Sequence, residues 1–125
     1  MSAAATQRVV IVGASDKPDR YAHMALTLLR HYGHEVVPVH PRLREIEGLA
    51  VVADLSDITG AVDTVTMYVG PAISVGLADK LISLKPRLVI FNPGAENAGL
   101  ATKLEAAGIS TEEACTLVLL RTGQF

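Results

Sequence analysis

The sequence predicts an α/β domain in which a doubly wound, mainly parallel sheet of five to six strands carries helices on both faces. Segments with strand character alternate with segments of helical periodicity along the chain, which is the pattern of βαβ units. Several strand segments are unbroken apolar runs, as expected of strands buried on both faces. Half of the 125 residues are hydrophobic but only 4% are aromatic, so aliphatic side chains must fill the core.

The first strand is expected over residues 8–12, a run dominated by Val and Ile that ends at Gly13. Turn-forming residues occupy 14–19. A helix follows, whose apolar residues recur at steps of three and four: Ala22, Ala25, Leu26 and Leu29. We expect Asp16 or Asp19 to cap its start and Gly33 to end it with a positive φ.

Further strands are expected at 35–39, 49–53, 63–69 and 87–91, and from Ile109 onward. Pro38 conflicts with the first of these, because proline lacks the N–H that a central strand donates. Helical segments are expected over 54–58, from Pro71 to before Pro86 with Ile73, Leu77 and Leu81 on one face, and over about 97–107 up to Gly108. Glu96 and Asn97 are expected to cap the last of these helices. Residues 115–120 fit either a strand or a helix.

Charge and hydropathy exclude several classes of partner. The formal net charge is −2, so no basic surface suggests nucleic acid, and the apolar runs fall short of the roughly 20 residues of a membrane span. Residues 1–7 lack the features of a secretory signal, and we expect them to form a flexible tail before a single domain over 8–125. Cys115 is the one cysteine, which excludes an internal disulfide. A cytosolic location is the default expectation.

Four loops are expected at one edge of the sheet, because parallel strands end at the same edge and ligands of such folds bind there. They are Gly13-Ala14-Ser15, His40-Pro41-Arg42, Tyr68-Val69-Gly70-Pro71 and Asn92-Pro93-Gly94. Each contains Gly or Pro, which any strand-to-helix turn needs, so a purely structural role is the alternative for each loop alone. Their expected placement on one rim favours a ligand site.

The first of these loops is the best candidate for binding an anion. Gly13 allows a tight turn, and the helix that follows presents free N–H groups and the positive end of its dipole. Ser15 could add a hydroxyl donor and Arg20 a cationic side chain. In the structural alternative, Ser15 caps the turn and Arg20 lies in solvent.

The first loop does not carry the G-x-G-x-x-G fingerprint of dinucleotide-binding folds, because Ser15 and Pro18 stand where that pattern has glycines. An NAD site also needs an acidic residue at the end of the second strand. This chain has at that place His40, Pro41, Arg42 and, just beyond, Arg44. Because arginines attract a phosphate on the ribose, the pattern disfavours NAD and favours a ligand such as coenzyme A (CoA) or NADP.

No catalytic constellation emerges from the sequence. His23, His31 and His34 lie on or beside the first predicted helix without a metal-ligand set, and no triad pattern links a nucleophile or carboxylate to His40. Cys115 is explained more simply as a small apolar residue than as a nucleophile. We therefore expect binding without catalysis.

The same residues resemble the small bacterial CoA-binding domain proteins, which are similar to the N-terminal CoA-binding domain of the succinyl-CoA synthetase α subunit. The resemblance covers nearly the whole chain after Gln7 and is carried by residues 9–29 with Gly13-Ala14-Ser15, Pro18 and Arg20, by 36–41, and by Gly48, 54–57, 68–71 and 92–94. Three positions depart from the family pattern. His40 stands where Asn is usual, Tyr21 where a small polar residue is common, and Ala114 in place of the Arg of an Arg-Cys pair.

The resemblance implies a Rossmann-like fold with CoA, or an acyl-CoA, bound along the predicted rim. Gly13, Ala14, Ser15 and Arg20 would then face the phosphates, while His40, Arg42 and Arg44 would lie near the ribose phosphate. Tyr68 to Pro71 and Asn92 to Gly94 would line the rest of the groove.

Two other functions stay open. One is an NADP-dependent reductase, which would need room for a substrate, and the other is a protein-interaction module that has lost its ligand. The apolar C-terminal segment 115–125 could pack across a two-fold axis in a homodimer, or could cover the protein's own sheet.

Overall fold

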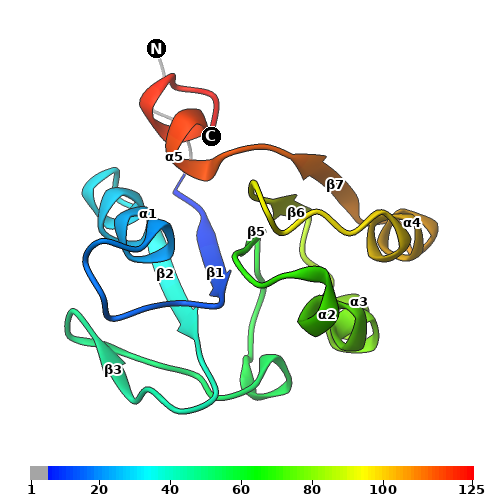
Figure 1. The fold of residues 1–125 in the computed structure, drawn as a ribbon, viewed down its shortest axis with the longest axis horizontal. Helices are drawn as coiled ribbons and strands as arrows, with labels where there is room; N and C mark the ends of the chain where they lie inside the picture. The colour runs from blue at the N-terminus through cyan, green and yellow to red at the C-terminus, as the bar shows by residue number, and fades with distance from the viewer. Residues whose placement is uncertain (1–5) are drawn as a thin grey trace.

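The computed structural model describes residues 6–125 and shows five parallel strands in the order β2-β1-β5-β6-β7 (Figure 1). The strands are β1 (Arg8–Val12), β2 (Glu35–Val39), β5 (Thr64–Met67), β6 (Leu88–Phe91) and β7 (Ser110–Glu113). The chain moves outward from β1 to β2 and then returns to build β5, β6 and β7 on the other side of β1. The strand order therefore reverses between β1 and β5, and the predicted doubly wound sheet is confirmed.

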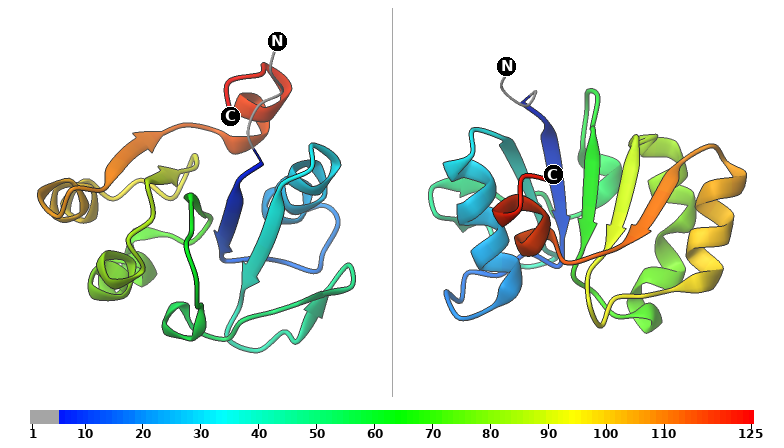
Figure 2. Two further views of the ribbon diagram at one scale, coloured as in Figure 1. Left: turned by 180° about the vertical axis from the view of Figure 1, so that it is seen from behind. Right: turned by 90° about the horizontal axis from the view of Figure 1, so that it is seen from above.

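Helices cover both faces of this sheet (Figures 1 and 2). They are α1 (Tyr21–His31), η1 (Leu55–Asp57), α2 (Pro71–Ser74), η2 (Val75–Leu77), α3 (Ala78–Leu84), α4 (Ala98–Ala106) and α5 (Thr116–Arg121). Alternate residues of β1 point to opposite faces: Val9 and Ile11 pack with α1 and α5, whereas Val10 and Val12 pack with η1, α3 and α4. Both faces of the sheet are buried under helices, which explains the continuous apolar runs of the sequence.

The predicted strand at 49–53 is only partly present. Residues Leu49–Ala50 form β4 of an antiparallel hairpin with β3 (Glu45–Ile46), and Val52 makes one parallel bridge with Val39 of β2. Glu47 and Gly48 form the two-residue turn of the hairpin with φ of 50° and 80°, as such turns require.

Pro38 is tolerated in β2 because its backbone faces the outer edge of the sheet, where, within residues 6–125, β2 is paired only through the single bridge to Val52. Its carbonyl oxygen accepts the N–H of Val52 at 2.9 Å, and the N–H and C=O of a strand residue point to the same side. The missing donor of Pro38 therefore faces Val52 rather than β1.

Two predictions for helix boundaries are wrong. Arg20 occupies the N-cap of α1 without a side-chain bond, so neither Asp16 nor Asp19 caps that helix. The segment after Pro71 is not one helix but three short pieces, because the 3-10 turn η2 interrupts it. The interruption resets the helical period, and Ile73 is consequently 62% exposed instead of sharing the buried face of Leu81.

The segment 115–120 is the helix α5, and it covers the protein's own sheet. Leu117 and Leu120 are buried, and Leu120 packs in the same core cluster as the apolar face of α1. Val118 points outward and is 52% exposed. Leu117 and Leu120 of this segment thus pack within the chain, and Val118 does not.

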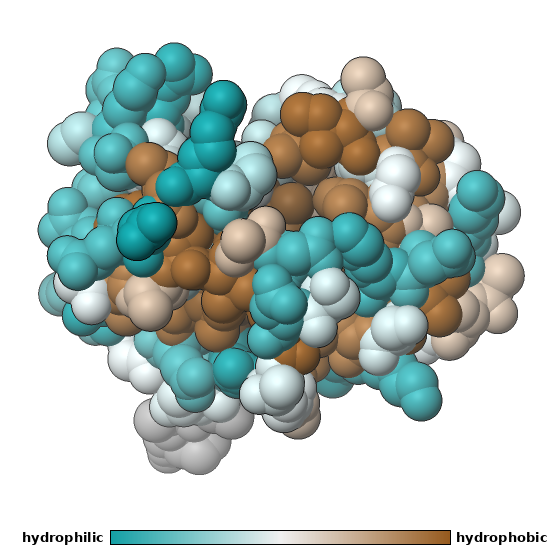
Figure 3. Space-filling view, turned by 90° about the horizontal axis from the view of Figure 1, so that it is seen from below, coloured by the Kyte–Doolittle hydropathy of each residue, from teal (hydrophilic) through white to brown (hydrophobic). Residues whose placement is uncertain are grey.

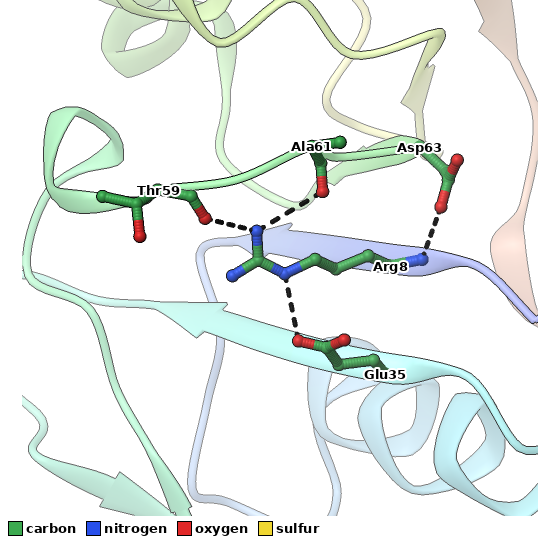
Figure 4. Close-up of polar contacts among 5 residues, drawn as sticks. All are labelled: Arg8, Glu35, Thr59, Ala61 and Asp63. Atoms are coloured by element: carbon green, nitrogen blue, oxygen red, sulfur yellow. Dashed lines mark hydrogen bonds and ion pairs between the residues drawn. The ribbon is translucent and has the colours of Figure 1, made fainter.

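Arg8 joins β1 to Glu35 of β2 and to the segment that leads into β5, at the amino edge of the sheet (Figure 4). Its backbone N–H donates to the carboxylate of Asp63 at 2.7 Å, and its Nε lies 3.0 Å from the carboxylate of Glu35. Its Nη1 also donates to the carbonyl oxygen of Thr59 at 2.6 Å. The protein's own polar groups therefore occupy this edge.

Gln7 and the C-terminus meet at His34. The Nδ1 atom of His34 accepts the N–H of Gln7 at 3.0 Å, and its ring lies 5.2 Å from that of Phe125. Residues 1–5 of the expected tail lie outside the described residues.

The fold is expected to lose stability as the pH falls below about 6.5, in part through His34. Partial burial lowers the pKa of His34 below its ordinary value of 6.5. The unfolded chain therefore binds more protons than the folded one in this range, so the free energy of unfolding decreases as the pH decreases. Urea unfolding at pH 7 and pH 5 measures the effect. A His34→Gln variant should show a smaller difference between the two pH values, and an unchanged difference would contradict the assignment.

Candidate functional site

A cleft of about 500 Å³ lies at the carboxyl edge of the sheet, next to the point where the strand order reverses. Its lining comes from the loops that follow β1, β2, β5 and β6: Gly13, Ala14, Ser15, Asp16, Lys17, Arg20, Tyr21, Ala22, His40, Leu43, Tyr68 and Pro93. All four predicted loops therefore contribute at least one residue to one cleft. In Figure 3 the carboxyl edge is at the top, where the outline is hollowed between a largely hydrophilic lobe on the left and a largely hydrophobic one on the right.

The free backbone amides of the site belong to the start of α1 rather than to the loop before it. The N–H groups of Gly13 and Ala14 both donate to the carbonyl oxygen of Val39, at 3.3 and 3.1 Å, so they bind β2. The first two N–H groups of α1, on Tyr21 and Ala22, have no acceptor within the helix, and the N-cap Arg20 provides none. Because the first turn also lacks an acidic residue, the positive end of the helix dipole is open to an anion.

Two cationic side chains line the cleft beside these amides. Lys17 and Arg20 are exposed, and within residues 6–125 their side chains form no hydrogen bond or ion pair with the protein. Asp16 also lines the cleft, so the net charge of the lining is positive when His40 is neutral. Sequence reasoning missed Lys17, although its position in the same loop as Ser15 was a usable signal.

Ser15 shapes the loop that carries these cations. Its Oγ accepts the N–H of Lys17 at 3.1 Å and so closes the turn. The hydroxyl hydrogen is still available to donate to a ligand. Ser15 can therefore cap the turn and donate a hydrogen bond to a ligand at the same time.

His40 organises the loop after β2. Its Nδ1 accepts the N–H groups of Arg42 and Leu43, each at 3.0 Å, which requires the neutral tautomer with its proton on Nε2. The bonds turn the chain so that Leu43 reaches the cleft. Pro41, Arg42 and Arg44 are exposed and lie outside the lining, next to His40 and Leu43 along the chain.

The loops after β5 and β6 reach the cleft through Tyr68 and Pro93, while Val69, Gly70, Pro71 and Gly94 do not line it. Asn92 is buried, and both hydrogens of its amide are used. They are donated to Thr66 Oγ1 at 2.7 Å and to the carbonyl oxygen of Met67 at 2.9 Å. Its Oδ1 accepts the N–H of Thr116 at 2.9 Å. In the described structure Asn92 therefore joins β5, β6 and α5.

A second, smaller cavity of about 240 Å³ adjoins the cleft. Its lining residues are Tyr21, Tyr68, Asn92, Pro93 and Cys115, of which Tyr21, Tyr68 and Pro93 also line the cleft. The two spaces are therefore neighbours that share one wall. Sequence reasoning placed neither Tyr21 nor Cys115 in the site.

Tyr68 lines both spaces. Its hydroxyl is buried without a hydrogen-bond partner among the described residues, and the nearby hydroxyls of Thr66 and Thr116 are bonded to each other at 2.8 Å. Burial raises the pKa of Tyr68 to about 12, against a weaker opposing effect of those hydroxyls. The phenol is therefore neutral at physiological pH.

No group of three His, Cys, Asp or Glu side chains able to hold a metal ion occurs within residues 6–125. In the same part of the chain, none of the helices has the length and hydropathy to cross a membrane.

Comparison with known proteins decides the family. The model of a family described as a CoA binding domain matches residues 7–121, which include every strand and helix of the fold. The chain belongs to the CoA-binding domain family. The resemblance noted from the sequence is thereby confirmed.

Solved structures of similar size share the CoA-binding domain fold over nearly their whole length. A crystal structure of an uncharacterized protein matches with a TM-score of 0.92 at 39% identity and covers 98% of this chain and 100% of that one. A Thermus thermophilus protein matches with a TM-score of 0.87 at 28% identity, over 96% of this chain and 91% of its own. The Rossmann-like α/β fold is therefore confirmed.

A curated relative and a further solved structure match over only part of their own length. The uncharacterized protein YneT of Bacillus subtilis (strain 168) is 32% identical over 77 residues, which are 62% of this chain and 57% of that protein. The dinucleotide-forming acetyl-coenzyme A synthetase 1 of Ca. Korarchaeum cryptofilum contains the same fold, with a TM-score of 0.73 at 23% identity. The match spans 84% of this chain but only 25% of the synthetase.

Proposed function

We propose that this protein binds CoA or an acyl-CoA in the cleft, without catalysing a reaction on it. The main support is the uncapped start of α1 beside Lys17 and Arg20, whose side chains have no partner within residues 6–125, in a cleft that is lined by all four loops. Free amides and cationic side chains together provide donors for a diphosphate. Membership of the CoA-binding domain family supports CoA as the bearer of that diphosphate.

Thermal unfolding with a set of nucleotides tests the proposal. CoA is expected to raise the midpoint of unfolding, because a ligand of the native state adds about 2.7 kcal/mol at a hundred times its dissociation constant. A larger response to NADP would favour the reductase, and no response to any nucleotide would favour the interaction module. Either result would overturn the proposal.

The cations of the cleft should account for a large part of the affinity. The double variant Lys17→Ala/Arg20→Ala is expected to weaken CoA binding by on the order of tenfold or more, because two charge-assisted contacts with phosphate are lost. Isothermal titration calorimetry at two salt concentrations measures the loss and its salt dependence. Lys103→Ala, which removes an exposed cation on α4, is the matched control. Equal affinities for the double variant and the control would exclude these side chains from the site.

Arg42 and Arg44 provide the proposed contact with the ribose phosphate. Dephospho-CoA, which lacks this phosphate, is expected to bind the wild-type protein more weakly than CoA. The double variant Arg42→Ala/Arg44→Ala should narrow the difference between the two ligands. A difference of unchanged size would show that these exposed arginines do not reach the ligand.

A cytosolic location and a homodimer are also part of the proposal. The exposed Val118 of α5 supplies an apolar contact for a second copy of the chain. Light scattering of the purified protein distinguishes the dimer from a monomer.

A further inference from the structure

The second cavity, between Tyr21, Tyr68, Pro93 and Cys115, adjoins the proposed CoA cleft. The residues common to both spaces are Tyr21, Tyr68 and Pro93. Because Tyr21 is the first residue of α1, the cavity lies next to a ligand that is anchored by its phosphates at the start of this helix.

The surface that lines this cavity is mostly apolar. It consists of aromatic rings, a proline ring, Asn92 and the weakly polar side chain of Cys115. Both amide hydrogens of Asn92 are bonded within the protein. An apolar group placed in this cavity would gain from burial.

The size of the cavity limits what it can take. At about 240 Å³ it has roughly half the volume of the cleft, so it is too small for a nucleotide and suits a chain of a few carbon atoms. From its lining, its volume and its position beside the cleft, we propose that this cavity is an acyl subsite. It takes the short, apolar acyl group of an acyl-CoA whose phosphates lie in the cleft. This inference rests on the proposed function.

A series of CoA thioesters tests the subsite in the wild-type protein. Affinities for CoA, acetyl-CoA, butyryl-CoA and palmitoyl-CoA are measured by isothermal titration calorimetry under reducing conditions. Each buried methylene group strengthens binding by about fourfold, so butyryl-CoA, which has two methylene groups more than acetyl-CoA, is expected to bind on the order of tenfold more tightly than acetyl-CoA. The gain should stop once the chain exceeds the cavity. Equal affinities for CoA, acetyl-CoA and butyryl-CoA would overturn the inference.

Two substitutions at Cys115 test whether the preference for butyryl-CoA arises in this cavity. Cys115→Leu should fill the cavity, and it is expected to bind CoA within about twofold of wild type while losing the preference for butyryl-CoA, because the lost contact is purely apolar. Cys115→Ala removes the thiol but keeps the space open, so it should retain the preference. A preference that persists in Cys115→Leu would place the acyl group elsewhere and overturn the subsite.

The same measurements separate the subsite from the function on which it rests. If CoA binds and the acyl group makes no difference, only the subsite fails. If neither CoA nor its thioesters bind, both the function and the subsite fail. Should Cys115→Leu not fold, the chain-length series on the wild-type protein still decides the question.

Discussion

Asn92→Asp is expected to lower the free energy of unfolding by about 3 kcal/mol at pH 7, which corresponds to a fall of roughly 10 °C in the unfolding midpoint of a domain of this size. The side chain of Asn92 is 2% exposed, and its Nδ2 lies 2.9 Å from the carbonyl oxygen of Met67. A carboxylate oxygen in that place would face an atom that can only accept, so the substitution would bury an unpaired charge. The loss should shrink at acidic pH, where a protonated carboxyl can donate to the same carbonyl.

Asn97→Asp is the matched control for this substitution. The Oδ1 atom of Asn97 caps α4 by accepting the N–H of Leu100 at 3.1 Å, and its Nδ2 donates to the hydroxyl of Ser74. Aspartate is as good an N-cap as asparagine, and a hydroxyl can reverse its role and donate to a carboxylate. Chemical unfolding of both variants measures the contrast. Similar losses in the two would contradict the structural role assigned to Asn92.

Gly13→Ala is expected to cost about 3 kcal/mol and to weaken CoA binding as well. Gly13 has a φ of 86°, a conformation that costs a residue with a Cβ about 1–2 kcal/mol. The added Cβ would also lie 2.8 Å from Cγ1 of Val69 and 3.1 Å from the carbonyl carbon of Tyr68. The side chain of Val69 can move aside, but the backbone of Tyr68, directly after β5, cannot, so the loop that contains Ser15 and Lys17 must shift.

Gly33→Ala separates the two parts of this cost. Gly33 has nearly the same φ, 88°, but nothing lies within 4 Å of the position that an added Cβ would take. Its substitution should therefore cost only the conformational part, about 1–2 kcal/mol, and leave CoA binding unchanged. Equal losses of stability in the two glycine variants would contradict a contribution from the close contact of Gly13 with Tyr68 and Val69.

Local patterns in the sequence predicted most of the fold because each reflects a short-range physical rule. Apolar runs mark strands buried on both faces, and Gly33 and Gly108 end helices with the positive φ expected of them. The break after α2 was not predictable from the spacing of Ile73, Leu77 and Leu81. A period of four is compatible with one continuous helix, and only tertiary packing decides that η2 interrupts it.

The site was predicted at the level of loops but not of individual atoms. The rule that ligands bind where strand order reverses is enough to bring Ser15, His40, Tyr68 and Pro93 to one cleft. The partners of the amides of Gly13 and Ala14, and of the side chain of Asn92, lie far away in the chain. Sequence spacing carries no information on such long-range hydrogen bonds, so these structural contacts could not be predicted.

Amide chemical shifts of the ¹⁵N-labelled protein during a CoA titration test whether CoA binds at the start of α1. The largest changes are expected at residues 15–22 and at Tyr68. Another hollow, of about 420 Å³, lies between η1 and α3, where Ser56 and Lys80 line it. Shifts confined to the surroundings of Ser56 and Lys80, or the absence of any shift with excess CoA, would contradict binding at the start of α1.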